Sequence, residues 1–424
     1  MLVVFLISMF SFILMSVPVS FSLMGTATIM MMFNGDVSAQ NLAQNLIKGV
    51  DSYPLLAIPF FMIAGEIMNK GGISIRIVKF AQALIGHITG GLGYVSVIAS
   101  MIFAGVSGSA VADTTAVGSV LIPIMEKNEY DVAKSTALVC SAGCIGPIIP
   151  PSIPLILYGV IAEVSVVKLF LGGIVPGVLI GIGLMIAWFF HVKNKNYKKF
   201  KRATVKEILI ALKEAFWASI LPVIILGGIL AGIATPTEAG VVAVVYALVV
   251  SMFVYKELKL SQIPEILIDG IKGTAIIMMV VGAAMTAAYL ITTAHIPELL
   301  SNALLSLTSN IYIILFLINV LLLLVGCVMD MGPAILILAP ILVPVIKGFG
   351  LDPVYFGVLM TVNLCIGLLT PPVGNVLYVG CSLSKISMLQ FARANLPFLG
   401  VMIVVLFIIT YIPGLILFIP SFFN

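Results

Sequence analysis

Long apolar segments follow one another through the sequence, and several are interrupted by residues that break a helix. Residues 105–113 read GVSGSAVAD and residues 146–152 read GPIIPPS, each inside an apolar run. The chain is 61% hydrophobic and only 9% charged, which leaves too little polar surface to cover a soluble core. It is therefore predicted to be an all-α polytopic membrane protein, in which irregular backbone at membrane depth lines a cavity in the protein.

Two segments, about 95–127 and about 311–347, differ from ordinary membrane-spanning helices. In the first, each apolar arm beside GVSGSAVADTT has about ten residues, or about 15 Å of helix. Such an arm reaches only halfway across a bilayer core about 30 Å thick. We expect a re-entrant helical hairpin in each segment, with its tip near mid-membrane; one long kinked helix is the alternative.

The placement of charge predicts the topology. Residues 193–202, KNKNYKKFKR, form a strongly basic loop that should lie in the cytoplasm, because Lys and Arg favour cytoplasmic loops. Residues 293–301 contain no Lys or Arg and should lie outside. On this topology the first hairpin enters the membrane from the cytoplasm and the second enters from the opposite side.

The two halves of the chain match at one fixed offset of 221 residues. CIGPIIPP, which starts at residue 144, lies over CIGLLTPP, which starts at residue 365. Five further pairs of identical residues share this offset: Gly105 and Gly326, Pro123 and Pro344, Gly159 and Gly380, Phe170 and Phe391, and Pro176 and Pro397. If each repeat has an even number of spans and one further helix links the two repeats, the second repeat is inverted in the membrane relative to the first.

The predicted domain organisation follows from this offset. The first inverted repeat covers 1–192, with scaffold helices over about 1–69 (residues 1–33 as one span), a hairpin over about 95–127 and a broken helix over 134–162. Residues 193–236 hold the basic loop and a linking helix at about 214–233. The second repeat covers 237–424, with its hairpin over about 311–347 and its broken helix over 355–383. Inverted repeats with broken helices are typical of secondary transporters, whose substrate and ion sites lie between the repeats.

The tip of the first hairpin has the residues of a cation site. Ser107 and Ser109 supply hydroxyl oxygens, Asp113 supplies a charge, and the small residues let the backbone approach an ion. An aspartate inside the membrane usually marks an ion pathway. The alternative is a small-residue surface on which helices pack. The second tip, GCVMDMG at 326–332, places Asp330 opposite Ser109 at the repeat offset.

Two double prolines interrupt the broken helices, in GPIIPPS (146–152) and in GLLTPPVGN (367–375). Each removes two backbone donors and frees carbonyl oxygens of the preceding turn, which can bind a cation. Ser152 and Asn375 follow at the start of the resumed half-helix, where donors would meet an anion. The alternative is a simple kink.

Other candidate residues favour structural roles. Thr235 and Glu238 fit a capping box with proline at the first helical position. Glu66 and Glu163 are expected near the ends of spans, in structural roles. The chain has no Gly-x-x-x-x-Gly-Lys-Ser/Thr phosphate loop, so it is not expected to hydrolyse ATP itself.

Five stretches together resemble one family over essentially the whole chain. They are FFMIAGEIMNKGG (60–72), GVSGSAVADTTAVGSVLIPIM (105–125), GPIIPPSIPLILYG (146–159), GIATPTEAG (232–240) and GLLTPPVGNVLYVG (367–380). These five stretches identify the chain as similar to the large membrane subunit of tripartite ATP-independent periplasmic (TRAP) transporters.

The resemblance implies a transporter and not an enzyme, in a bacterial inner (cytoplasmic) membrane. Its partners would be a small four-helix membrane subunit, as a separate chain, and a periplasmic substrate-binding protein. Uptake of an organic acid, such as a C4-dicarboxylate, sialic acid or another sugar acid, would be coupled to at least two Na⁺ ions, with no prosthetic group. The hairpins and broken helices would move against the scaffold as an elevator.

The resemblance also implies site residues. One Na⁺ site would use Ser107, Gly108, Asp113, Gly146 and Pro150. The other would use Gly326, Met329, Asp330, Gly367 and Thr370, mostly through backbone carbonyls. The organic acid would lie between them, near Ser107, Ser109, Ser152 and Asn375.

Two alternatives have distinct signatures. A Na⁺-coupled carboxylate carrier that works alone would share the hairpins and would need no binding protein. An intramembrane aspartyl protease would use Asp113 and Asp330 as a dyad. The residues before them are Ala112 and Met329, which differ from the Tyr-Asp and Gly-x-Gly-Asp contexts of such proteases, and the duplicated proline breaks would go unexplained.

Overall fold

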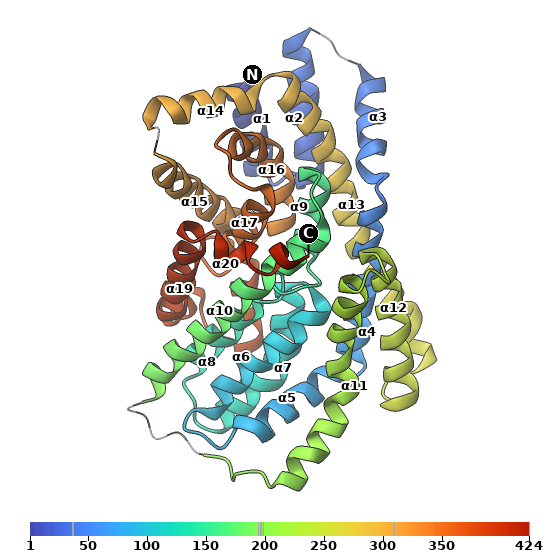
Figure 1. Cartoon of the computed structure of the whole chain (residues 1–424), viewed down its shortest axis with the longest axis vertical. Coiled ribbons are helices and arrows are strands. Elements are labelled where there is room, and N and C mark those ends of the chain that lie inside the picture. Colours follow the sequence, from blue (N-terminus) through green and yellow to red (C-terminus); the bar gives the residue numbers. More distant parts are fainter. Residues whose placement is uncertain (36–37, 194, 196, 198, 309, 424) are drawn as a thin grey trace.

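The computed structural model describes residues 1–35, 38–193, 195, 197, 199–308 and 310–423, and every regular element in these ranges is helical (Figure 1). Seven of the described helices are long and apolar enough to cross a membrane, or eight if the bent pair formed by residues 39–50 and 53–70 counts as one span. The chain is therefore a multi-pass membrane protein. The α-helices are α1 (Leu2–Leu14), α2 (Val19–Asn34), α3 (Ala39–Val50), α4 (Ala57–Lys70), α5 (Ile73–Ile85), α6 (Gly91–Ser107), α7 (Ala110–Lys127), α8 (Val132–Gly143), α9 (Ile153–Ala162), α10 (Val166–Val192), α11 (Val205–Leu230), α12 (Pro236–Val249), α13 (Ile263–Thr293), α14 (Ile296–Leu307), α15 (Ile311–Val328), α16 (Met331–Gly348), α17 (Pro353–Gly367), α18 (Asn375–Ser384), α19 (Met388–Tyr411) and α20 (Gly414–Leu417). Short 3₁₀ segments cover Tyr53–Leu56, Leu260–Gln262 and Pro420–Phe422, and a π-helical turn, Val250–Val254, extends α12.

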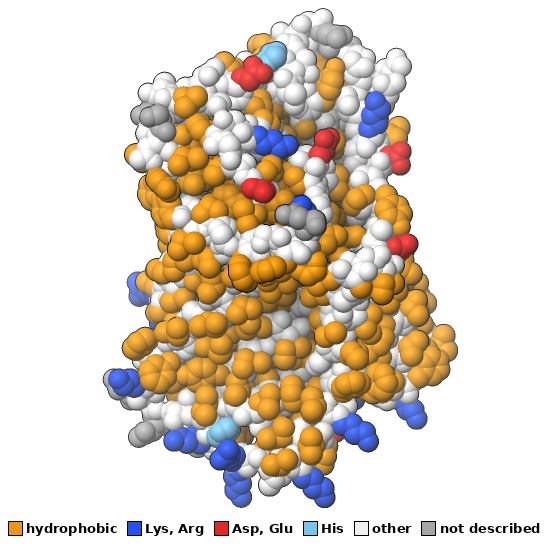
Figure 2. Space-filling view, in the orientation of Figure 1, with side chains coloured by type: hydrophobic (Ala, Val, Ile, Leu, Met, Phe, Trp, Pro, Cys, Tyr) orange, Lys and Arg blue, Asp and Glu red, His pale blue; other side chains and the backbone are white. Residues whose placement is uncertain are grey.

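Charged side chains are distributed unevenly along the long axis of the molecule. Hydrophobic side chains cover most of the visible face, and Lys and Arg side chains gather at its lower end, where α10 leads into α11 (Figure 2). Asn194, Asn196 and Lys198 of the predicted basic loop lie outside the described residues. By the positive-inside rule, the lower end of the molecule is predicted to face the cytoplasm.

Helix boundaries recur at the offset found in the sequence. Helix α16 begins 221 residues after α7 (331 against 110) and ends 221 residues after it (348 against 127). A helix pair followed by an interrupted helix therefore occurs twice, as α6–α7 with α8–α9 and as α15–α16 with α17–α18. The first pair lies in the lower half of Figure 1 and the second in the upper half.

The arms of the first helix pair are longer than predicted. They have 17 residues in α6 and 18 in α7, instead of about ten, and α15 and α16 of the second pair have 18 residues each. Helices α6 and α7 continue through glycine and polar residues on either side of their apolar runs, and several of these, such as Ser107, Asp113 and Thr114, are buried. The tip between α6 and α7 is nevertheless formed by Gly108 and Ser109, inside the predicted stretch.

The two halves of the molecule pack crosswise. Helix α7 packs against α18, the second part of the other half's interrupted helix, and α16 packs against α9 in the corresponding way. Helices α10 and α19 also pack against the opposite half of the chain: α19 packs against α8 of the first half, and α10 packs against α17 of the second half. This exchange brings the two helix-pair tips and the two breaks to the centre of the molecule.

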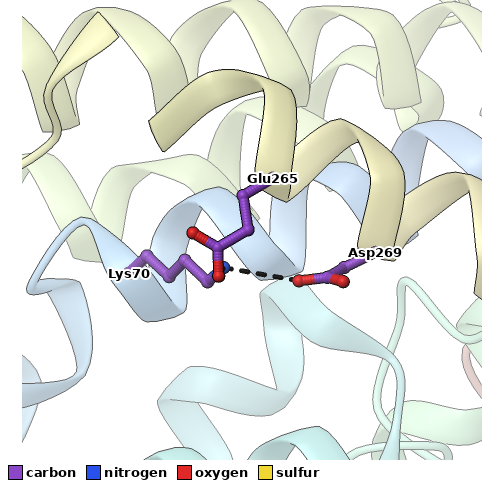
Figure 3. Close-up of polar contacts among 3 residues, drawn as sticks. All are labelled: Lys70, Glu265 and Asp269. Carbon is purple, nitrogen blue, oxygen red and sulfur yellow. Dashed lines mark hydrogen bonds and ion pairs between the residues drawn. The ribbon is translucent and has the colours of Figure 1, made fainter. Parts of the chain in front are cut away.

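A second group of helices is centred on α13, whose 31 residues pack against α2, α3 and α4. Lys70, at the end of α4, lies between two carboxylates of α13 (Figure 3). Its Nζ is 3.1 Å from Oε1 of Glu265 and 3.4 Å from Oδ2 of Asp269. We call this group, with α1, α11 and α12, the scaffold.

Two details of the scaffold differ from the sequence prediction. Residues 1–33 contain two helices and not one span, because Ser16 has a φ of 60° and Pro18 starts α2 in a new direction. The linking helix α11 begins at Val205, earlier than the predicted 214, because Thr204 and Glu207 form a capping box. The predicted capping box of Thr235 and Glu238 is confirmed at the start of α12.

Candidate functional site

The first tip is a tight turn against the first break. Gly108 has a φ of 61°, a conformation that glycine adopts without strain. A Cβ atom at this position would lie 2.5 Å from the carbonyl oxygen of Pro151. Ser109 starts α7, and its hydroxyl accepts a hydrogen bond from the backbone N–H of Ala112 at 3.4 Å. The turn therefore needs glycine both for its backbone conformation and for its contact with the double proline.

Asp113 lies in the first turn of α7 and is completely buried. Its Oδ1 accepts a hydrogen bond from the Ser107 hydroxyl, and its Oδ2 has no hydrogen-bond partner among the described residues. Oδ2 lies against Gly146, where an added Cβ atom would overlap it. A buried carboxylate without a compensating partner is costly, and this cost is removed by a bound cation or by a proton.

The first break spans the residues between α8 and α9 and includes a cis Pro150–Pro151 bond. Ser152 is fully buried and starts α9: its hydroxyl donates to the carbonyl of Pro147 and accepts from the N–H of Leu155 at 3.2 Å. The Pro150 carbonyl faces Gly105 of α6, 3.9 Å from the position of a Cβ atom there. The Ser152 hydroxyl thus links Pro147, near the start of the break, to Leu155, in the first turn of α9.

The second tip meets the second break through different contacts. The backbones of Gly326 and Gly367 are in contact. A Cβ atom added to Gly326 would lie only 3.1 Å from the Cα atom of Gly367. The Thr370 hydroxyl donates to the Gly367 carbonyl at 2.7 Å and contacts the Cys327 sulfur at 2.8 Å. The second double proline, Pro371–Pro372, is also cis.

Asp330 differs from Asp113 in its surroundings. Asp330 is exposed and starts α16, and its Oδ1 accepts a hydrogen bond from Nδ2 of Asn375 at 2.8 Å. Met329 immediately precedes it and is buried. The carboxylate at the second tip is therefore accessible to solvent, whereas the carboxylate at the first tip is buried.

A cavity of about 620 Å³ lies between the two tips and the scaffold. Three of the four residues predicted to contact substrate line it, namely Ser107, Ser109 and Asn375, whereas Ser152 does not. The predicted cation ligands Gly108 and Asp330 also line it. The first turns of α7 and α16 face this space, so two helix N-termini, which attract anions, border it.

The scaffold contributes polar residues to this cavity that the sequence prediction missed. Glu66 and Asn69 of α4, together with Ser20 of α2, line its wall. Glu66 was predicted to lie near the end of a span in a structural role, and it does lie near the end of α4, on the cavity wall. A charged residue in an apolar helix is the signal in the sequence that could have pointed to the cavity. Gly65 itself lies beside the first tip, with a virtual Cβ atom 3.7 Å from the Ser107 Cα. Among the described lining residues, Glu66 and Asp330 are acidic and none is Lys or Arg.

Comparison with known proteins gives a consistent family. Residues 6–415 match the model of the family described as tripartite ATP-independent periplasmic transporter, DctM component. A putative TRAP transporter large permease protein of Haemophilus influenzae is 47% identical over 98% of each chain. The 2,3-diketo-L-gulonate TRAP transporter large permease protein YiaN of Escherichia coli is 43% identical over 96% of this chain and 95% of its own length.

Two further similarities concern a named substrate and the fold. The sialic acid TRAP transporter large permease protein SiaM of Vibrio cholerae is 39% identical over 96% of this chain and 95% of its own length. The crystal structure of the YdaH transporter of Alcanivorax borkumensis aligns with a TM-score of 0.65 at 13% identity, over 88% of this chain and 87% of that one. At this identity the second similarity concerns the fold alone.

Proposed function

The chain belongs to the DctM family of tripartite ATP-independent periplasmic transporters, so it is a transporter permease and not an enzyme, and we propose that it carries an organic acid inward together with Na⁺. The observation that carries the Na⁺ coupling is the buried Oδ2 of Asp113, which has no hydrogen-bond partner among the residues that the structure describes and lies beside the Gly146 backbone. Na⁺ is a hard cation that is bound by carboxylate, hydroxyl and carbonyl oxygens. One ion would be held by Asp113, Ser107, Gly108, Gly146 and Pro150.

A second Na⁺ ion would lie at the other tip, close to Asp330. Its ligands would be Gly326, Met329, Asp330, Gly367 and Thr370, mostly through backbone carbonyl oxygens. The backbone contact between Gly326 and Gly367 supports this proposal, since it places the tip directly on the break. Two ions bound beside the cavity would add positive charge to a space whose own charged side chains are acidic.

The substrate would be an organic acid in the central cavity. Because no Lys or Arg is among its described lining residues, the substrate carboxylate would be bound by neutral donors and by the N-termini of α7 and α16. Ser107, Ser109 and Asn375 supply the hydroxyl and amide groups. Relatives named for sialic acid and diketogulonate support a sugar acid, and a C4-dicarboxylate is the other class.

Transport would follow an elevator mechanism. The body formed by α6–α9 and α15–α18 contains both tips and both breaks, and the cavity lies between this body and the scaffold. Without a bound ion, the unpaired Asp113 carboxylate would have to move through the apolar interior of the membrane, and this cost opposes movement of the body. With ions and substrate bound, the charges are offset and the body can slide. This order of binding couples uptake to the Na⁺ gradient.

The proposed partners complete a tripartite system in a bacterial inner membrane. They are a small four-helix membrane subunit and a periplasmic protein that delivers the substrate. The family assignment supports both partners. A carrier that works alone would need neither.

Uptake into proteoliposomes tests this function. The chain and its small subunit would be reconstituted, and uptake of labelled sugar acids and C4-dicarboxylates would be measured with and without a Na⁺ gradient and with and without the binding protein. Uptake that requires both the gradient and the binding protein is the expected result. Uptake that requires Na⁺ alone would instead show a carrier that works without a binding protein.

A further inference from the structure

A second cavity, of about 460 Å³, lies between α5, α11 and the end of α12, away from the central site. Helices α5 and α11 pack against each other in the lower part of the molecule, where basic side chains gather (Figures 1 and 2). The residues that line this cavity, which we call the lower pocket, are Ile75, Arg76, Lys79, Lys213, Glu214, Trp217, Val254, Tyr255 and Glu257. The proposed transport function uses none of them.

Arg76 forms the inner wall of the lower pocket. Its Nη2 lies 2.7 Å from Oε1 of Glu257, and its Nη1 donates to the Gly72 carbonyl at 2.8 Å. Its guanidinium also lies over the Tyr255 ring, 3.9 Å from the ring centre. Arg76 therefore neutralises Glu257 and is held by three contacts.

Two lysines remain available to bind an anion. Lys79 of α5 and Lys213 of α11 are exposed, and neither has an ion-pair partner in the part of the chain that the structure describes. Once Arg76 and Glu257 are counted as a pair, these two lysines outnumber Glu214, the remaining acidic residue of the lining. The pocket thus has an excess of positive charge contributed by two helices.

The surroundings of the lower pocket are those of a membrane interface. The Trp217 side chain is 43% exposed. The hydroxyls of Tyr246 and Tyr255 donate at 2.8 Å to the backbone carbonyls of Trp217 and Glu214, and so tie α12 to α11. Trp and Tyr concentrate at the level of lipid headgroups. Exposed valines at 223, 245 and 249 of these two helices offer an apolar surface for acyl chains.

From this arrangement we propose that the lower pocket binds the headgroup of an anionic phospholipid of the cytoplasmic leaflet. Lys79 and Lys213 contact the phosphate, Trp217 lies at the level of the glycerol backbone, and the acyl chains lie along the exposed apolar side chains of α11 and α12. Basic pockets between membrane helices on the cytoplasmic side are the usual sites for such headgroups. The lipid would join α5 to α11 at the edge of the scaffold.

Trp217 gives a direct probe of this pocket. The chain has two tryptophans, and the other, Trp188, is completely buried. The full chain would be placed in liposomes in which phosphatidylglycerol or phosphatidylcholine with brominated acyl chains replaces unbrominated lipid. We expect brominated phosphatidylglycerol to quench the Trp217 fluorescence at a lower mole fraction than brominated phosphatidylcholine.

Substitutions in the lower pocket separate a site from diffuse charge attraction. K79Q/K213Q should remove most of the preference, since each lysine near an anionic lipid contributes on the order of a fivefold change in affinity. K201Q/K206Q removes two exposed basic charges from the same end of the molecule, outside the pocket lining, and should keep the preference. K79R/K213R should keep it too, which guards against misfolding as the cause.

Three results would overturn the proposal. The first is equal quenching by the two brominated lipids. The second is an equal loss of preference in K79Q/K213Q and K201Q/K206Q, because the effect would then be due to overall charge. The third is loss of the preference on adding millimolar inorganic phosphate at constant ionic strength, because the pocket would then take a free anion in place of a lipid.

Discussion

Oδ2 of Asp113 lies against the backbone of Gly146 without a hydrogen-bond partner among the described residues, although the two residues belong to different helical segments. The hydroxyl of Ser107 holds the other carboxylate oxygen. The contact is close because Gly146 has no side chain. It joins the first tip to the first break, and the proposed Na⁺ coupling rests on it.

Gly146→Ala tests whether this space is needed. The added methyl group would overlap Oδ2, so we expect a loss of about 1–3 kcal/mol of stability and a large loss of Na⁺-dependent uptake. Thermal unfolding in detergent and vesicle uptake would be measured together. Gly400→Ala is the matched control, because a Cβ atom there meets nothing within 4 Å. Wild-type Na⁺ dependence in Gly146→Ala would mean that no ion occupies this space.

The hydrogen bond between Asn375 and Asp330 predicts a different phenotype. Asp330 is exposed, so Asn375→Ala leaves its carboxylate accessible to water, and stability should change by no more than about 0.5 kcal/mol. The KM for the organic acid should rise, because Asn375 lines the central cavity. Kinetics of uptake and a melting curve would show both effects. Asn302→Ala, on the exposed surface of α14, should alter neither value; a large drop in melting temperature for Asn375→Ala alone would indicate a structural role.

Two cations, Lys70 of α4 and Arg76 of α5, allow a prediction of relative stability. Lys70→Gln breaks contacts to Glu265 and Asp269, whose side chains are 69% and 44% exposed, so it should cost less than about 1 kcal/mol. Arg76→Gln loses an ion pair, a bond to the Gly72 carbonyl and the contact with the Tyr255 ring, and should cost about 1–3 kcal/mol. Unfolding in denaturant would give both values; the reverse order would show that the cluster in Figure 3 is the stronger scaffold contact.

Much of the helical framework could be predicted from local sequence. Glycine, serine and paired prolines inside apolar runs located the tips and the breaks, because these residues act on their own backbone. The capping box at Thr235 and Glu238 was predicted for the same reason. The turn at Ser16 was not predicted, since an apolar run does not show where the chain reverses, and the arms of the first helix pair were predicted too short.

The relationships between distant residues could not be predicted in this way. Glu66 faces the central cavity because the scaffold packs against the first tip, and the sequence of α4 alone does not reveal that neighbour. The crosswise packing of α7 on α18 and of α16 on α9 depends on both halves being folded.

The most decisive measurement is the Na⁺ dependence of substrate uptake by Asp113→Asn in proteoliposomes that also contain the small subunit and the binding protein. The substitution keeps the shape of the side chain and removes its charge, so folding should be preserved and the Na⁺ concentration for half-maximal uptake should rise at least about tenfold. Asp51→Asn, an exposed carboxylate at the end of α3, is the control and should behave as wild type. An unchanged Na⁺ dependence in Asp113→Asn would contradict the assignment of Asp113 as a ligand of the coupling ion.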